Sequence, residues 1–122
     1  LFSDLLTIFQ DMESRIGSTG QPLSEEVVVV VCSEMGRGPF LNATGGKDHW
    51  TFTSAMLIGQ GVRGGQVVGA FDENFLGRPI DLNSGEPTDS GTLLSSENIG
   101  ATILALADID PGTVEPISAV LS

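Results

Sequence analysis

Cysteine, histidine and tyrosine are nearly absent from this chain of 122 residues, which contains one cysteine, one histidine and no tyrosine. A single cysteine excludes an internal disulfide and any cysteine-rich zinc site, so the chain is not a small disulfide-stabilised scaffold. Long hydrophobic runs are also lacking, because the longest, residues 27–32, is far too short to span a bilayer. The sequence therefore predicts a globular chain that does not insert into a membrane.

Basic residues are scarce as well. The chain has 5 Lys and Arg residues against 16 Asp and Glu residues, which gives a net charge of −11. A phosphate backbone would be repelled over most of such a surface, and no basic stripe compensates for it. Nucleic acid and anionic membranes are therefore excluded as expected partners. The hydrophobic fraction of 40% is nevertheless sufficient for the packed core of one domain.

Two segments have the apolar spacing of amphipathic helices. Residues 1–16 predict the first, which is expected to end at the glycines of residues 17–20, because glycine can adopt the left-handed conformation that closes a helix. Residues 95–107 predict the second, with Ser95 or Ser96 as its N-cap.

The β-strand signals lie between these helices. Residues 26–32 contain five consecutive valines without polar alternation, which is typical of a strand covered on both faces in the centre of a parallel sheet. Residues 66–71 and 78–82 predict short peripheral strands, and residues 51–58 fit either a strand or a short helix. The apolar tail, residues 114–121, is expected to return against the sheet. The fold class predicted from this pattern is α/β.

A long loop, residues 33–53, follows the valine-rich strand and combines glycines with polar side chains. Open α/β sheets bind their ligands at the carboxyl ends of such strands. Within the loop, Asp48 and His49 place a carboxylate beside an imidazole, a pair that can bind one or two divalent metals. Two other interpretations remain open: His49 as a hydrogen-bonded structural residue, and Asp48 as the cap of a helix that follows it.

Two further residues of the loop have two interpretations each. Glu34 can bind a metal or form an ion pair with Arg37, and the spacing alone favours the ion pair. Trp50 is either a hydrophobic anchor or a platform on which a substrate stacks.

Two nucleotide or metal motifs are incomplete. Residues 59–64 satisfy the GxGxxG pattern, but a β-like, glycine-rich segment follows where a dinucleotide site needs a helix, so a glycine-dependent loop is predicted. Residues 72–77 begin like a calcium loop, yet Leu76 stands where such a loop needs an oxygen ligand and Asn83 where it needs a bidentate Glu.

Several segments taken in order carry a resemblance to a known family. They read VVVVVCSEMGR, GGKDHW, AMLIGQGVRGGQVVGAFDE and SSENIGATILALADIDP. Over residues 1–112 the chain resembles the carboxyl-terminal portion of a large uncharacterised bacterial family of sulfatase-like proteins in the alkaline phosphatase superfamily. The resemblance implies an α/β/α sandwich around a largely parallel sheet, of which residues 1–122 form the carboxyl-terminal part of a single domain.

The resemblance also implies a chemistry. Members of the superfamily hydrolyse phosphate or sulfate esters with a Ser, Thr or modified Cys nucleophile and one or two divalent metals, here zinc, calcium or manganese. By this resemblance Asp48 and His49 are metal ligands, Glu34 is a third ligand, and Arg37 contacts the anion. Relatives carry a better ligand at the position of Met35, whose thioether is poorly suited to hard cations.

The resemblance places the nucleophile and the first metal carboxylates in an amino-terminal half that these residues do not include. The chain alone is therefore expected to be an inactive fragment. Its valine-rich strand would leave an apolar edge exposed, so association with the missing half or with itself is expected. A periplasmic or exported location is implied. The alternative is a non-catalytic exported binding or scaffold protein of the same fold, in which Glu34, Asp48 and His49 form a hydrogen-bonded loop lock.

Overall fold

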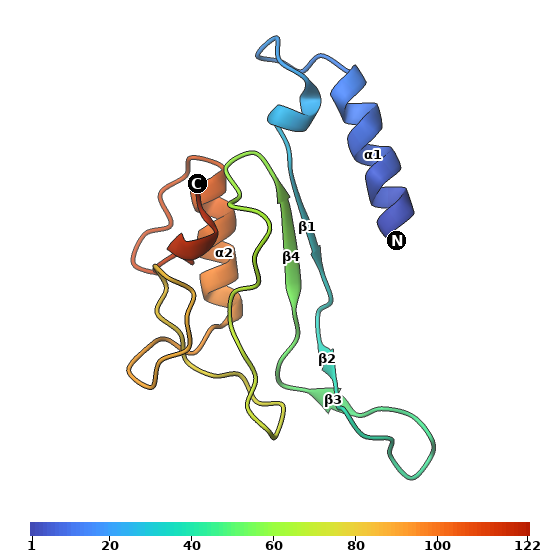
Figure 1. Cartoon of the computed structure of the whole chain (residues 1–122), viewed down its shortest axis with the longest axis vertical. Coiled ribbons are helices and arrows are strands. Elements are labelled where there is room, and N and C mark those ends of the chain that lie inside the picture. The colour runs from blue at the N-terminus through green and yellow to red at the C-terminus, as the bar shows by residue number, and fades with distance from the viewer.

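The computed structural model describes residues 1–122 and contains two α-helices, two short 3₁₀ helices and four strands (Figure 1). The strands form two antiparallel pairs, β1 with β4 and β2 with β3. In chain order the elements are α1 (Phe2–Ser14), η1 (Leu23–Glu25), β1 (Val28–Cys32), β2 (Gly36–Arg37), β3 (His49–Trp50), β4 (Ala55–Gly59), α2 (Ser96–Leu106) and η2 (Ser118–Val120).

The β1–β4 ribbon runs through the middle of the molecule, between α1 and α2 in the view of Figure 1. Its register pairs Val28 with Gly59 and Cys32 with Ala55. The valines of β1 are half-buried and Cys32 is exposed, so β1 is not covered on both faces as its composition predicts. Neither strand has a second neighbour in a sheet. The largely parallel α/β/α sandwich stays a prediction, because two short antiparallel pairs are too small to test it.

The helix α1 confirms the first helical pattern but ends earlier and for another reason. Arg15 follows its last residue in an extended conformation, with φ −103° and ψ 139°. The Arg15 Nε and Nη2 atoms donate to the Asp11 carboxylate at 2.6 and 3.0 Å. The chain therefore leaves the helix before it reaches the glycines that were predicted to end it. Packing of α1 is mainly against η1, not on the ribbon.

The helix α2 confirms both the second helical pattern and the predicted cap. The Ser95 hydroxyl accepts a hydrogen bond from the Glu97 N–H at 3.2 Å, and the Asn98 side chain accepts one from the Ser95 N–H at 3.0 Å. This reciprocal pair is a capping box, which satisfies backbone donors that the first helical turn leaves free.

The buried core lies in the carboxyl-terminal half of the chain. Its four buried residues come from two segments, which contribute Ile80 with Leu82 and Ile117 with Ala119. The predicted strands at residues 66–71 and 78–82 form only isolated bridges, such as those of Ile80 with Pro87 and with Thr92. Prolines, which lack an N–H group, and glycines interrupt these segments, so regular ladders do not form.

The carboxyl-terminal tail returns beside the end of β4, where Leu121 forms a bridge with Val62. The ambiguous segment at residues 51–58 resolves as strand β4, which begins at Ala55. No helix in the chain is both long and apolar enough to cross a membrane.

The chain exposes an unusually large surface. Its accessible area is 8260 Å² for a mass of 12.7 kDa, whereas a compact monomer of that mass exposes about 6,200 Å². Only 11 of the 122 residues are buried. The shape responsible is visible in Figure 1, where α1 and the β2–β3 hairpin extend from opposite ends of the ribbon.

Candidate functional site

The β2–β3 ladder brings two of the predicted site residues together. Its register pairs Arg37 directly with His49, and Gly36 with Trp50. Directly opposed residues of an antiparallel pair direct their side chains to the same face, so Arg37 and His49 share one face of the ladder. Both residues are exposed.

Glycine is required at position 36 of this ladder. A Cβ atom at Gly36 would overlap the backbone carbonyl of Phe52. This close approach places the segment after β3 against β2. The Gly38 N–H extends the pairing by donating a hydrogen bond to the Asp48 carbonyl at 2.8 Å. The position of Arg37 is therefore fixed by backbone contacts on both of its sides.

Asp48 is held by the loop that connects β2 with β3. The Asn42 Nδ2 donates to Asp48 Oδ1 at 2.8 Å. The Asn42 Oδ1 in turn accepts from the Thr44 N–H at 3.1 Å and the Gly46 N–H at 2.9 Å. The interpretation of Asp48 as a helix cap is wrong, because the residues that follow it form β3.

Glu34 and Arg37 do not form the ion pair that their spacing favours. Arg37 Nη1 donates instead to the Lys47 carbonyl at 3.3 Å. No carboxylate forms an ion pair with Arg37, and the chain's ion pairs involve Arg15, Arg78 and the N-terminal amine. Glu34 is exposed and makes no side-chain hydrogen bond. The ion-pair interpretation is therefore wrong, and the Arg37 charge is available to another anion.

The family resemblance implies a metal, but the residues of this chain do not gather into a site that could hold one. No three His, Cys, Asp or Glu side chains of the chain are grouped closely enough to hold one metal ion. Asp48 directly precedes β3, and His49 is its first residue. This chain alone therefore does not supply a complete set of metal ligands.

An aromatic groove lies beside Arg37. It has a volume of about 230 Å³ and is lined by Arg37, Pro39, Trp50, Phe52, Phe71 and Phe75. The indole Nε1 of Trp50 donates to the Phe75 carbonyl at 2.8 Å, which joins β3 to the turn before Gly77. The rings of Phe52 and Phe71 meet edge to face with centroids 6.4 Å apart. Trp50 therefore anchors structure and also lines an open groove.

The sequence did not predict this groove, although Trp50 and Arg37 were identified as candidate functional residues. A signal was present, because four of the six phenylalanines and the only tryptophan lie between residues 40 and 75. These residues belong to separate loops, however, and only the folded chain shows which of them meet.

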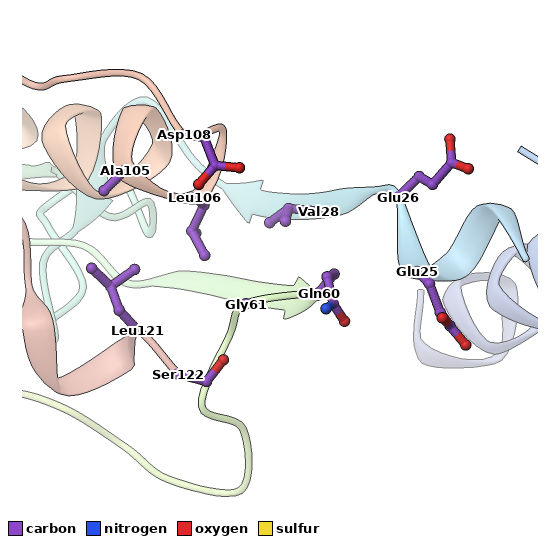
Figure 2. Close-up of a pocket in the computed structure, with 10 residues that line it drawn as sticks. All are labelled: Glu25, Glu26, Val28, Gln60, Gly61, Ala105, Leu106, Asp108, Leu121 and Ser122. Carbon is purple, nitrogen blue, oxygen red and sulfur yellow. The ribbon is translucent and has the colours of Figure 1, made fainter. Parts of the chain in front are cut away.

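A second cleft, of about 380 Å³, lies between η1, the start of β1, the end of α2 and the carboxyl terminus (Figure 2). Glu25, Glu26 and Asp108 give it an acidic lining. The carboxylate of Glu26 is already bound to Ser18 and Thr19, and the three acids do not form a group that could hold a metal. None of the predicted site residues lines this cleft.

The two incomplete motifs form loops. Gly59 ends β4, and residues 60–64 turn without starting a helix, so the motif forms the predicted glycine-dependent loop and not a dinucleotide site. Asp72 uses its Oδ1 within its own turn, where it accepts from Asn74 N at 2.8 Å and from Leu76 N at 2.9 Å.

The sequence was also compared with known proteins. Residues 10–114 match the family described as protein of unknown function (DUF1501). The chain belongs to this family. The DUF1501 match contains the β2–β3 ladder, the loop that holds Asp48 and every residue of the aromatic groove. No curated protein and no solved structure matches the chain.

Proposed function

We propose that this DUF1501 chain is the carboxyl-terminal part of a sulfatase-like hydrolase of the alkaline phosphatase superfamily that cleaves phosphate or sulfate esters. The observation that carries the proposal is the pairing of Arg37 with His49 across the β2–β3 ladder. A guanidinium binds planar oxyanions through several N–H donors, and a neutral imidazole is a common metal ligand. The ladder therefore presents an anion contact and a metal ligand side by side.

In this proposal Asp48, His49 and Glu34 contribute ligands to a divalent metal site that is completed by residues outside this chain. The metal would supply Lewis-acid polarisation of the ester. The 122 residues themselves bind the ester anion through Arg37 and hold Asp48 in position through Asn42. The nucleophile also lies outside the chain, so the chain alone is expected to show no turnover. A periplasmic or exported location belongs to the same proposal.

One observation favours a second function, that of a non-catalytic exported binding or scaffold protein. Asp48 already accepts a hydrogen bond from Asn42, which ties together the turn that contains Thr44 and Gly46. A carboxylate used in this way acts as a loop lock and needs no metal. The thioether of Met35, which is poorly suited to hard cations, agrees with this second function.

The metal content of the complete protein separates the two functions. Elemental analysis of the wild type is compared with Asp48→Asn, His49→Ala and a control, Asp89→Ala. The Asp48→Asn variant keeps an oxygen that accepts from Asn42 but removes the charge of the ligand. Asp89 is an exposed aspartate whose nearest cation, Arg78, is 3.9 Å away.

We expect both variants to weaken metal binding by about 100-fold or more, because Asp48→Asn removes the charge of one ligand and His49→Ala removes another ligand, and loss of a residue that only supports a ligand already costs about 10- to 100-fold. Turnover of aryl phosphate and aryl sulfate esters should fall in parallel, and Asp89→Ala should match the wild type. Equal metal content in all four proteins would overturn the ligand assignment. A wild type without metal and without turnover would establish the scaffold function instead.

A further inference from the structure

The aromatic groove is exposed in a way that an ordinary core cluster is not. Phe71 is 52% exposed and Phe75 is 48% exposed, although both line the groove. Phe40 lies next to them, with its ring edge to face against Phe75 at a centroid distance of 6.4 Å, and is 75% exposed. Large aromatic rings gathered at a surface commonly mark a binding site.

Contacts within the chain hold the walls of the groove in place. The indole of Trp50 donates a hydrogen bond to the Phe75 carbonyl. The ring of Phe52 packs so closely against Gly77 that a Cβ atom on residue 77 would lie 2.7 Å from it. Phe75 has a φ of +60°, which is uncommon for a residue other than glycine. The Asp72 carboxylate, bonded to the neighbouring N–H groups, and the Trp50 indole hold this turn in place.

The charge at the groove is positive, in contrast to the rest of the chain. Arg37 is its one charged lining residue, and no carboxylate is among the other five. Arg37 makes one hydrogen bond, to the Lys47 carbonyl, and no ion pair. A guanidinium has five N–H donors, so most of its donors remain for a ligand. In a chain with a net charge of −11, this is a local site for an anion.

We propose that the groove binds a single aromatic ring that bears an anionic group, with the ring against Trp50, Phe52 and Phe71 and the anion on Arg37. The volume of about 230 Å³ suits one ring, because an apolar cavity of about 150 Å³ is enough for benzene. Edge-to-face and stacked contacts select a flat ring over an aliphatic group of the same size. The sulfonate, sulfate or phosphate group then determines the orientation through Arg37.

This inference deepens the proposed function and rests on it in one respect: if the protein hydrolyses esters, the groove selects aryl sulfate or aryl phosphate esters. Binding itself requires neither metal nor turnover. A sulfonate that cannot be hydrolysed therefore tests the groove separately from the hydrolase. Loss of metal or activity would leave the groove intact, and loss of sulfonate binding would leave the metal assignment intact.

The experiment follows the indole N–H of Trp50 by ¹H–¹⁵N NMR, since the chain has only one tryptophan. Three probes are titrated: 4-methylbenzenesulfonate, 4-methylphenol and methanesulfonate. We expect a saturable shift with the aromatic sulfonate, a weaker one with the uncharged phenol and none with methanesulfonate. Arg37→Gln should weaken binding of the aromatic sulfonate by about fivefold and leave binding of the phenol unchanged.

Two further variants separate the ring contact from the charge contact. Phe71→Ala should weaken binding of both aromatic probes, and Arg63→Gln, at an exposed arginine away from the groove, should change neither. The inference is overturned if no probe shifts the indole signal, or if methanesulfonate binds as well as the aromatic sulfonate. It is also overturned if the signal moves with protein concentration alone, because a second copy of the chain then occupies the groove.

Discussion

The carboxylate of Glu26 accepts four hydrogen bonds from the turn between α1 and η1. The N–H groups of Ser18 and Thr19 each donate at 2.8 Å, and their hydroxyl groups donate at 3.0 and 2.6 Å. The Thr19 hydroxyl and N–H, followed by the donors of Ser18, lower the pKa of Glu26 from 4.5 to about 2. The ionised form of Glu26 therefore holds the turn to the beginning of β1.

The pH dependence of stability should report this contact. Because the folded-state pKa lies below the unfolded value, the ionised carboxylate contributes its full stability above about pH 4.5, and the contribution disappears as the pH falls through about 2. We expect Glu26→Gln to lower the melting temperature at pH 7, and the difference from wild type to vanish near pH 2. Thermal unfolding followed by circular dichroism measures both.

Glu13→Gln is the control for this prediction, since Glu13 is an exposed glutamate of α1. It should leave the melting temperature close to that of the wild type at every pH. A Glu26→Gln difference that stays constant from pH 7 to about pH 2 would contradict the proposed contribution of the carboxylate.

The sequence predicted little of this contact. Glu26 lies seven and eight residues from its partners, so no local pattern joins them. Gly17 was interpreted as a residue that ends the helix, but a Cβ atom there would overlap the Glu26 carboxylate. The glycine is required for space beside a side chain that is distant in sequence. Arg37 and His49 illustrate the same limit, because their pairing depends on how the intervening loop returns.

At the scale of elements, the sequence predicted structure where the signals are local. Ser95 and Asn98 are three residues apart, and their capping box fixes the start of α2. The segments around Val68 and Ile80 have strand-like composition, but Pro79 lies within the second segment and Ile80 forms one of its bridges with Pro87. The resulting pairs are single bridges, because a ladder needs regular backbone donors on both sides.

A buried hydroxyl joins α2 to the carboxyl-terminal segment. Thr102 Oγ1 donates to the Asn98 carbonyl at 2.7 Å and accepts from the Ile117 N–H at 2.9 Å, and Thr102 has no exposed surface. Thr102→Val keeps the shape of the side chain but leaves the Ile117 N–H without its partner. We expect a loss of about 1–3 kcal/mol in the free energy of unfolding, measured by urea denaturation.

Thr113→Val is the matched control, because Thr113 is exposed and makes no side-chain hydrogen bond. It should change the free energy of unfolding by less than about 0.5 kcal/mol. Equal stability of Thr102→Val and wild type would show that water or another group satisfies the Ile117 N–H. The hydroxyl would then not be what joins the two segments.

At the scale of the whole molecule, the composition of β1 predicts more cover than the chain provides. Consecutive valines favour a strand, and that prediction is confirmed for Val28–Cys32. Whether both faces of the strand are covered depends on other segments, and β1 pairs only with β4. The central position in a parallel sheet stays a prediction for the same reason. Composition can indicate that a surface needs a partner, but it does not say which chain supplies one.

The accessible surface of the chain exceeds that of a compact monomer of this mass by about 2,000 Å². A typical specific interface buries about 800 Å² on each partner, so the surplus is enough for a stable one. Part of the exposed apolar area lies on α1, where Phe2 and Leu6 are 74% and 58% exposed. In the absence of any other partner, a second copy of the chain can cover this helix.

We therefore expect the chain to associate reversibly with itself through α1. Sedimentation velocity over a range of concentrations should show the weight-average mass rising from 12.7 kDa toward twice that value. A reducing agent is included because Cys32 is exposed and could form an intermolecular disulfide. Leu6→Lys should shift the association to higher concentration, because it places a charge on the apolar face of the helix.

Val67→Lys is the control for a general effect of added charge, since Val67 is 93% exposed and lies outside α1. If Val67→Lys weakens association as much as Leu6→Lys, net charge and not α1 controls the assembly. A chain that stays monomeric at every concentration would show that its surplus surface is stable in water. The apolar face of α1 would then need no partner, and the proposed association with a second copy would be wrong.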